Sequence, residues 1–198
     1  MGNSYCIIIL AAGTSSRLGT PKQLLSFNNS TLLGYTIEQA TMTRHQLVVV
    51  LGAYADEVRK EIKQENLLIV ENKEWQEGIA SSIRCGINEI MAMLPGCDAI
   101  VLLTCDQPFV DAALINKLIS VHKQTGKDIV ATDYGNAIGP PVLFHKNVFH
   151  ELLKLHGDSG ARMILDEYKN RRTTVYFPTA IVDINTMSDY EYFKSDNR

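Results

Sequence analysis

The sequence predicts a doubly wound α/β fold, in which a mostly parallel sheet carries helices on both faces. Three observations favour this fold class. Short, continuously apolar runs are typical of strands that are covered on both sides. Segments with helical periodicity alternate with these runs along the first two thirds of the chain. A loop rich in glycine and hydroxyl residues directly follows the first run, where α/β proteins bind their ligands.

Each strand is expected where an apolar run is bounded by polar or turn-forming residues. The main strands are expected at Tyr5–Leu10, Leu47–Leu51, Leu67–Val70, Ala99–Leu103 and Asp128–Ala131. Shorter strands are expected at Val142–Phe144, Thr173–Phe177 and Ile181–Ile184. Between the two groups, Gly135–Pro141 is rich in Gly and Pro and predicts a loop.

The helices are expected where apolar residues recur at one-turn spacing. Thr31 and Asp111 can cap two of them, because a side-chain oxygen at that place accepts a hydrogen bond from a free backbone N–H. The expected helices are Thr31–Thr43, Tyr54–Lys63, Ile79–Met93, Asp111–Thr125, Val148–Leu155 and Ser159–Tyr168. Because the elements after residue 130 are short, we expect them to form a small substrate-binding elaboration of one domain spanning residues 1–198.

Composition excludes several classes of protein. The chain has 198 residues and a formal net charge of -3, which gives no support for a nucleic-acid partner. No apolar segment approaches the ~18 residues that a membrane span requires. The four cysteines show no CxxC spacing and the five histidines no HExxH pattern, so no zinc site is indicated. We expect a cytoplasmic protein.

The most informative segment is the loop Leu10–Lys22, with the sequence LAAGTSSRLGTPK. Small residues such as Gly13 let several backbone N–H groups approach a phosphate chain. Arg17 and Lys22 would add positive charge beside it. The Walker A and GxGxxG patterns are both absent, and a plain glycine-rich turn with two solvated basic residues would have the same composition.

The order of residues in this loop resembles the LAAG-x-S-x-R-x-G-x-x-K pattern of MobA-like nucleotidyltransferases, which have a Rossmann-like fold. The resemblance implies that Leu10, Ala11, Ala12 and Gly13 bind the nucleotide. It also gives Arg17 and Lys22 triphosphate-binding and catalytic roles. In that family LAAG accompanies cytidylyltransferases and LAGG guanylyltransferases. A methyl group at Ala12 would disfavour a purine, although one methyl is worth only about 1–3 kcal/mol.

A second motif, N-x-x-W-x-x-G-x-x-x-S, begins at Asn72 and resembles the segment that contacts cytosine in the cytidylyltransferase subgroup. The resemblance implies nucleotide binding by Gly78, Ser81 and Ser82. Hydroxyls and free N–H groups at a helix start can bind a base or ribose, but without the resemblance plain helix capping is the favoured explanation of the serines. Trp75 is interpreted as a packing residue.

Two aspartates are candidate metal ligands. Asp106 ends an apolar strand in the run CDQP, which also matches the subgroup, and a carboxylate there can hold a divalent cation that bridges phosphates. Asp183 ends the short expected strand at 181–184 and lies in a segment resembling the family's D-I-D-T-P-x-D. Here Asn185 and Met187 replace an aspartate and the proline. The alternatives are a turn aspartate at 106 and a surface acid at 183, with Asp189 capping a final helix.

The segment 135–190 resembles the acceptor-binding part of the same subgroup. The resemblance implies acceptor contacts from Gly139 and Pro140, where G-H-P is usual. It implies the same for the GDSGAR run, which contributes Gly157, Asp158, Gly160 and Arg162. The departure at Pro140 removes a polar contact. Without a ligand, Asp158 would simply be an N-cap.

Taken together, the resemblance implies transfer of CMP from CTP to a phosphomonoester, expected to be molybdopterin, with release of pyrophosphate. Catalysis would rely on Arg17, Lys22 and Asp106 with Mg²⁺ or Mn²⁺, and no Ser/His or Cys/His nucleophile is visible. A molybdoenzyme or its chaperone is an expected partner. Three alternatives stay open: a GTP- or sugar/polyol-phosphate nucleotidyltransferase, a non-catalytic nucleotide-binding module, and a glycosyltransferase, for which a DxD motif is lacking.

Overall fold

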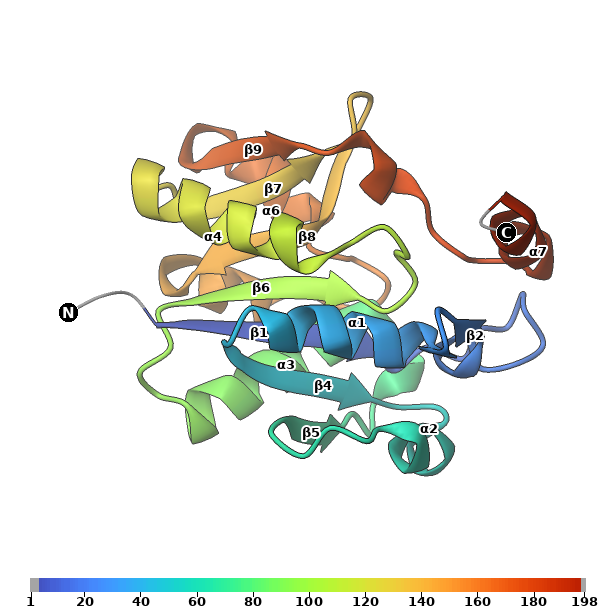
Figure 1. Cartoon of the computed structure of the whole chain (residues 1–198). Helices are drawn as coiled ribbons and strands as arrows, with labels where there is room; N and C mark the ends of the chain where they lie inside the picture. The colour runs from blue at the N-terminus through green and yellow to red at the C-terminus, as the bar shows by residue number, and fades with distance from the viewer. Residues whose placement is uncertain (1–3, 197–198) are drawn as a thin grey trace.

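The computed structural model describes residues 4–196, and its centre is a seven-stranded sheet (Figure 1). The strands are β1 (Tyr5–Ala11), β4 (Gln46–Leu51), β5 (Leu68–Glu71), β6 (Ala99–Thr104), β7 (Ile129–Asp133), β8 (Ile138–His145) and β9 (Arg172–Tyr176). Their order across the sheet is β5-β4-β1-β6-β8-β7-β9. Only β8 pairs antiparallel with its neighbours, so the predicted mostly parallel sheet is confirmed.

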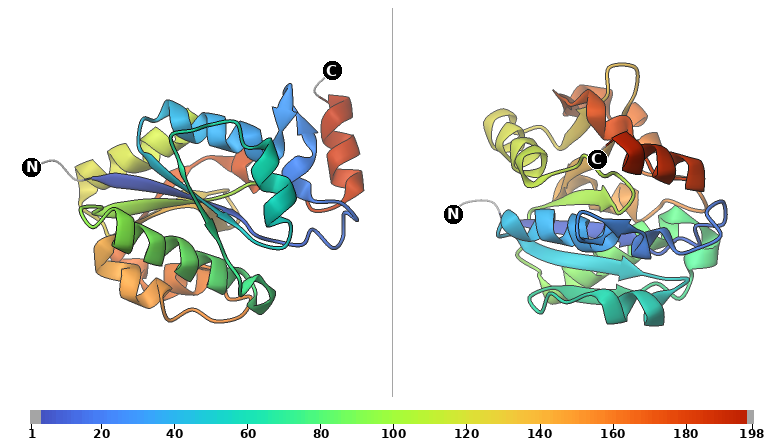
Figure 2. Two further views of the ribbon diagram at one scale, coloured as in Figure 1. Left: turned by 90° about the horizontal axis from the view of Figure 1, so that it is seen from below. Right: turned by 45° about the vertical axis from the view of Figure 1, so that its right-hand side comes forward.

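Helices cover both faces of this sheet, as the predicted fold class requires (Figure 2). One face packs against α1 (Leu32–Met42), α2 (Ala55–Glu61) and α4 (Ala112–Thr125). The other packs against α3 (Ile79–Met93), α5 (Phe149–Leu152) and α6 (Arg162–Glu167). Side chains of β1 alternate between the two cores, since successive residues of a strand point to opposite faces.

Local sequence explains where the helices begin. The side chains of Thr31 and Asp111 accept hydrogen bonds from the N–H groups of Gly34 and Leu114, at 3.0 and 2.8 Å, so both predicted N-caps are confirmed. No helix within residues 4–196 is long and apolar enough to span a membrane.

Two predictions for the C-terminal third are wrong. The expected loop Gly135–Pro141 is largely strand, because β8 already begins at Ile138. In the pairing of β8 with β7, Val142 lies opposite Ala131 and Gly139 lies opposite Thr132. The two residues between them on β8, Pro140 and Pro141, therefore have no partner and form a bulge. Proline has no N–H to donate to a ladder, so a bulge is the place in a strand where it fits.

The expected strand Ile181–Ile184 does not form either. Pro178–Ile181 is a 3₁₀ turn, and the residues after it run over the carboxyl edge of the sheet without pairing. They are held by other bonds, since Ile184 N–H donates to the carbonyl of Asp106 at 2.9 Å. A short apolar run cannot by itself show whether a partner strand is near.

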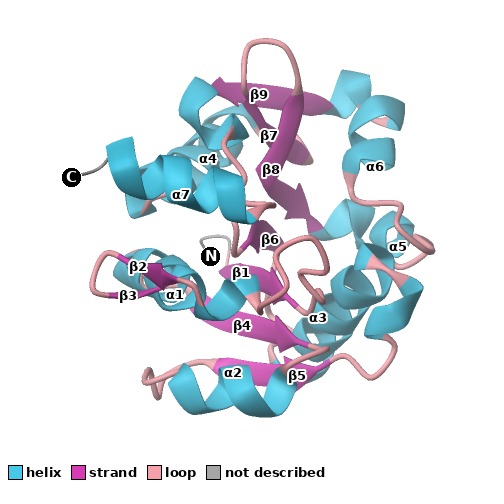
Figure 3. Ribbon diagram, turned by 90° about the vertical axis from the view of Figure 1, so that its right-hand side faces the viewer, coloured by secondary structure: helices cyan, strands magenta, loops and turns pink. Residues whose placement is uncertain are grey.

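Two further elements lie at that edge, and the sequence predicts residue bounds for neither of them. They are the hairpin of β2 (Ser26–Phe27) with β3 (Ser30–Thr31) and the last helix, α7 (Met187–Asp196). They lie together beyond the carboxyl ends of the strands (Figure 3). A small core that includes Leu18, Phe27, Ile184 and Tyr190 joins them to the loop after β1.

The topology determines where a ligand can bind. The chain moves from β1 outward to β4 and β5, and then returns to place β6 on the opposite side of β1. At this switch point the connections leave β1 and β6 in opposite directions, so a crevice opens outside their carboxyl ends. Leu10 pairs with Thr104 there, which brings the loop after β1 beside the residues that follow β6.

Candidate functional site

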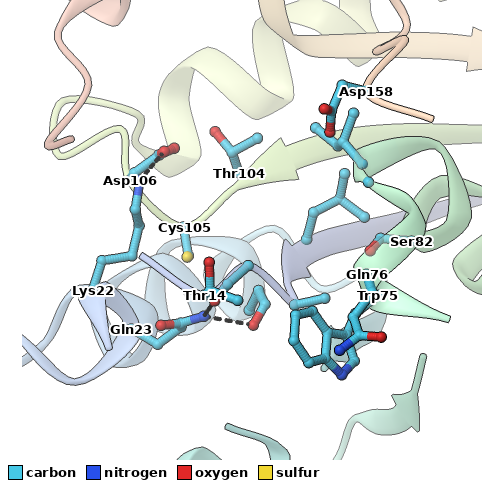
Figure 4. Close-up of a pocket in the computed structure, with 16 residues that line it drawn as sticks. Thr14, Lys22, Gln23, Trp75, Gln76, Ser82, Thr104, Cys105, Asp106 and Asp158 are labelled. Carbon is cyan, nitrogen blue, oxygen red and sulfur yellow. Dashed lines mark hydrogen bonds and ion pairs between the residues drawn. The ribbon is translucent and has the colours of Figure 1, made fainter. Parts of the chain in front are cut away.

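A cavity of about 400 Å³ occupies this switch point (Figure 4). Such a volume lies within the range of ligand sites. One wall is the loop after β1, the floor is the end of β6, and the other wall is the start of α3 with the turn before it. The lining residues are Leu10, Ala11, Ala12, Gly13, Thr14, Lys22, Gln23, Trp75, Gln76, Gly78, Ile79, Ser82, Thr104, Cys105, Asp106 and Asp158.

The loop after β1 is held from behind by its carbonyl groups. Gln23 is buried, and its Nε2 donates to the carbonyls of Ala11 and Gly13 at 2.8 and 3.0 Å. The Ala12 carbonyl accepts from Ala53 N–H at 3.1 Å. In a planar trans peptide the next N–H points opposite to its carbonyl, so the N–H groups of Gly13 and Thr14 face away from these partners. The loop therefore offers amides for an anion.

Gln23 was missed by sequence reasoning, because nothing in its spacing distinguishes it from a surface glutamine. Its other amide atom, Oε1, is buried and has no hydrogen-bond partner among the described residues. A buried acceptor without a partner lowers the stability of the fold. Such a cost is typical of a functional site, here a loop whose geometry is maintained for a ligand.

Lys22 and Asp106 meet at the opposite end of the cavity from Ser82 (Figure 4). Lys22 Nζ lies 2.8 Å from Asp106 Oδ2 and 3.0 Å from Asn185 Oδ1. Both charged side chains are mostly shielded, with 16% and 19% of their surface exposed. Asn185, noted in the sequence as a departure from the family pattern, thus lies directly against the candidate catalytic pair.

Asp183 comes from the exposed segment after the last 3₁₀ turn. Partial loss of hydration, followed by the negative charge of Asp106, raises the pKa of Asp183 to about 6, and Lys22 opposes the rise. The Asp106 carboxylate, whose charge opposes the ionisation of Asp183, therefore lies near it at this edge. Asp183 does not itself line the cavity.

These residues fit a divalent cation. Carboxylate and amide oxygens are ligands that Mg²⁺ and Mn²⁺ prefer, and a cation would relieve the repulsion between Asp106 and Asp183. The ammonium group of Lys22 already supplies positive charge at Asp106. Residues 4–196 contain no cluster of three or more His, Cys, Asp or Glu side chains suited to a metal, so phosphate oxygens and water would have to complete the coordination.

The two serines at the start of α3 have different surroundings, and only one of them lines the cavity. Ser81 Oγ donates to the Gly78 carbonyl at 2.8 Å and accepts from Asn72 Nδ2 at 2.7 Å, and Ser81 does not line the cavity. Ser82 also receives a bond from Asn72, at 3.0 Å, but it does line the cavity. Trp75 packs on the core beneath α3, as expected, and lines the cavity as well.

The acceptor residues expected from the sequence do not gather in one place. Asp158 lines the cavity beside Gly78 and Ile79. Gly139, Pro140, Gly157, Gly160 and Arg162 are not among its lining residues. Arg162 is exposed at the start of α6.

A clamp ties Asp158's loop to the start of α3. Glu77 accepts from Gly157 N–H at 3.1 Å, and Ala80 N–H donates to the Gly157 carbonyl at 3.1 Å. Arg84 bonds both to Glu77 and, at 2.6 Å, to the Leu155 carbonyl. The Arg84 guanidinium and then the Gly157 N–H lower the pKa of Glu77 to about 2. The two loops therefore form one continuous wall.

Arg17 lies outside the cavity. It is exposed on the outer part of the loop and makes no hydrogen bond or ion pair within the described part of the chain. It contributes slightly to a lowered pKa of Asp189, which is caused mainly by N–H groups at Asn185 and by Thr186. These bonds cap α7, as the structural alternative for Asp189 anticipated.

Gln107 was also missed, although it stands in the CDQP run. It is buried, and its Nε2 donates to the carbonyls of Ala180 and Pro140 at 2.8 and 3.1 Å, while its Oε1 accepts from Thr104 at 3.2 Å. One side chain thereby joins the end of β6 to β8 and to the turn that precedes Asp183. The bonded carbonyls lie in distant segments, which is why the sequence contains no signal for the contact.

An amide-lined loop at the switch point of a doubly wound sheet, facing carboxylates beside a lysine, defines a nucleotide-handling α/β protein. Residues 7–173 match the MobA-like NTP transferase domain. The chain therefore belongs to this nucleotidyltransferase family, and the resemblance noted in the sequence is confirmed.

Proteins with similar sequences have names that refer to different activities. Nicotine blue oxidoreductase of Paenarthrobacter nicotinovorans is 32% identical over 172 residues, covering 80% of this chain and 79% of that protein. Molybdenum cofactor cytidylyltransferase of Escherichia coli strain K12 is 23% identical over 185 residues, covering 92% of each.

Solved structures share the fold over nearly the whole chain. Rv0371c from Mycobacterium tuberculosis H37Rv has a TM-score of 0.83 and 31% identity, covering 98% of this chain and 100% of that one. Its complex with manganese has a TM-score of 0.77 and 29% identity, covering 97% and 98%.

Proposed function

We propose that this protein is a cytidylyltransferase that moves CMP from CTP to a phosphomonoester, with molybdopterin as the expected acceptor, and releases pyrophosphate. The observation that carries the proposal is the meeting of Lys22, Asp106 and Asn185 beside a loop whose carbonyls at residues 11–13 are hydrogen-bonded behind it. The cytidylyltransferase name of the Escherichia coli relative supports CTP and the acceptor, as does Ala12 in the cavity wall.

In this proposal each part of the cavity binds one part of the substrates. The amides after β1 hold the phosphate chain, and Ala12, Gly78 and Ser82 surround the base and ribose. Lys22 exchanges its carboxylate partner for phosphate oxygens when the nucleotide enters. Arg17 would have to swing inward from its exposed position to reach them, as would the acceptor residues that now lie outside the cavity.

Asp106 and Asp183, with Asn185 beside them, would hold Mg²⁺ or Mn²⁺. The manganese complex of the Mycobacterium tuberculosis protein supports a divalent ion. Bound there, the metal would neutralise charge on the phosphates and on the pyrophosphate leaving group. The chain's own residues supply positioning and electrostatic stabilisation, the main requirements for joining two anions.

A covalent enzyme intermediate is not required. The cavity contains one thiol, Cys105, and burial raises its pKa to about 12. A thiol with that pKa is not a nucleophile at neutral pH. The acceptor phosphate would instead attack the α-phosphorus of CTP in line, with residues 135–190 holding the acceptor. We place the reaction in the cytoplasm, where a molybdoenzyme or its chaperone could receive the product.

Magnesium-dependent release of pyrophosphate, measured with each nucleoside triphosphate with and without molybdopterin, tests the proposal. CTP with molybdopterin should give the highest rate, and Asp106→Asn should lose at least a hundredfold in kcat, the order expected for removing a charged contact made in the transition state. Asp166→Asn is the matched control, because Asp166 is exposed on α6 away from the cavity.

Other outcomes would select the alternatives. Faster turnover with GTP, or with a sugar or polyol phosphate as acceptor, would move the protein to another branch of the family. Nucleotide binding without any pyrophosphate would leave a binding module. Full activity in Asp106→Asn would remove the metal assignment.

A further inference from the structure

Asp158 is a carboxylate in the wall of a cavity that we assign to a polyanion. Its side chain has no hydrogen bond or ion pair with any of residues 4–196. It lies on the far side of the cavity from the Lys22–Asp106 pair, at the end where Ser82 is found (Figure 4). The residue is exposed at the cavity wall, so its carboxylate is free to accept a hydrogen bond from a ligand that enters.

We infer that Asp158, which the resemblance counts among the acceptor residues, instead accepts a hydrogen bond from the exocyclic amino group of the nucleotide base, and so selects CTP against UTP. The inference rests on the proposed function. Chemistry decides which part of the ligand faces Asp158, because a carboxylate repels phosphate groups. Ribose hydroxyls are the same in CTP and UTP. The 4-amino group of cytosine donates hydrogen bonds, whereas the 4-oxo group of uracil can only accept them.

The position of Asp158 is well determined by the fold. The Gly157 peptide is bonded on both sides, to Glu77 and to Ala80, so the backbone before Asp158 cannot drift from the start of α3. A Cβ on Gly78 would overlap Asp158 Oδ1, which shows how closely the carboxylate approaches the predicted base-binding glycine. The backbone that carries the carboxylate is therefore preorganised, which lowers the cost of ordering this wall when a ligand binds.

Asp158 and Ala12 would select the base by different properties. Ala12 acts through size and disfavours purines by the bulk of its methyl group. Asp158 acts through hydrogen bonding, and a hydrogen-bonding site rejects an analogue that lacks the donor more strongly than an apolar wall rejects bulk. Of the four common bases, cytosine alone is both small and provided with an amino group.

Calorimetric titration of CTP and of UTP, with Mg²⁺ and without any acceptor, tests the inference. The wild-type protein should prefer CTP. In Asp158→Asn the ratio of the CTP and UTP association constants should fall by about ten- to a hundredfold, because an amide can donate to the uracil oxygen. Asp158→Ala should weaken CTP without strengthening UTP. Asp166→Asn removes a charge at an exposed site and should leave the ratio unchanged.

Thermal melting of each variant establishes that it is folded. An unchanged ratio in both Asp158 variants would overturn the inference while CTP binding, and with it the proposed function, stands. Equal binding of CTP and UTP by the wild-type protein would overturn it too. A raised KM for the acceptor with an unchanged ratio would assign Asp158 to the acceptor instead. Absence of any nucleotide binding would overturn the proposed function itself.

Discussion

Replacing Gly78 by alanine should destabilise the fold for two separate structural reasons. Gly78 has φ 118° and ψ -174°, a backbone conformation that essentially only glycine adopts. A Cβ there would also lie 2.6 Å from the carbonyl carbon and oxygen of Gly157. Both atoms belong to backbone that is hydrogen-bonded to Glu77 and Ala80, so they cannot move aside without breaking those bonds.

The expected loss of stability follows from these two costs. Backbone strain of this kind costs about 1–3 kcal/mol. Overlap with a packed neighbour costs a further ~1–3 kcal/mol. We therefore expect Gly78→Ala to reduce the free energy of unfolding by about 2–6 kcal/mol, a large part of the ~5–15 kcal/mol that stabilises a typical domain. Nucleotide affinity should fall as well, because the cavity wall shifts.

Urea unfolding of three variants separates the contributions. Gly126 has φ 61° but open space around its Cβ position, so Gly126→Ala measures left-handed strain alone, about 1–2 kcal/mol. Gly96 has neither problem, and Gly96→Ala should change stability by no more than ~0.5 kcal/mol. If Gly78→Ala were no more destabilising than Gly126→Ala, the close approach of Gly157 would be refuted.

Three further predictions concern single contacts. Asp111→Ala removes the N-cap of α4 and should lower the free energy of unfolding by about 1 kcal/mol, which urea titration measures, and no change would show that the cap is dispensable. Gln107→Met leaves the buried carbonyls of Ala180 and Pro140 without this donor and should cost ~1–3 kcal/mol. It should also raise the Mg²⁺ concentration needed for half-maximal activity, whereas a purely structural role would leave that concentration unchanged. For Glu77, the folded pKa of about 2 lies below its ordinary value of 4.5, so its ionised form stabilises the fold at neutral pH. This contribution should be complete above pH ~4.5 and should be lost as the pH falls toward ~2. Unfolding of wild type and Glu77→Gln across that range should show a stability difference that shrinks on acidification, and a constant difference would contradict the assignment.

Much of the fold was predictable because its signals are local. The apolar run at β1 and the one-turn repeat of α3 depend on residues close together in the sequence, and α3 has the predicted bounds, Ile79–Met93. The Thr31 and Asp111 caps need only a side chain and an N–H three residues later. Where a segment needs a distant partner, prediction was wrong or absent, as at the first half of β8 (138–141), whereas its second half was predicted as a strand.

The candidate site divides in the same way. The family resemblance found Leu10–Gly13 of the glycine-rich loop, Lys22, Gly78, Ser82, Asp106 and Asp158, and all of them line one cavity. It also named Arg17, Ser81, Asp183, Gly139, Pro140, Gly157, Gly160 and Arg162, which the structure places outside the lining of that cavity. Gln23 and Gln107 were found only in the structure, since a glutamine acquires a structural role from the carbonyls that surround it.

By itself, the sequence determined the fold class, the positions of most buried strands and helices, and the family, because hydrophobic periodicity and motif spacing are properties of the chain in order. The tertiary structure alone decided that β6 returns to the far side of β1, which creates the cavity and brings Lys22 to Asp106. It alone placed Asp158 against Gly78, eighty residues away in the chain. Contacts of this kind depend on how the chain closes upon itself, and no short window of sequence encodes that closure.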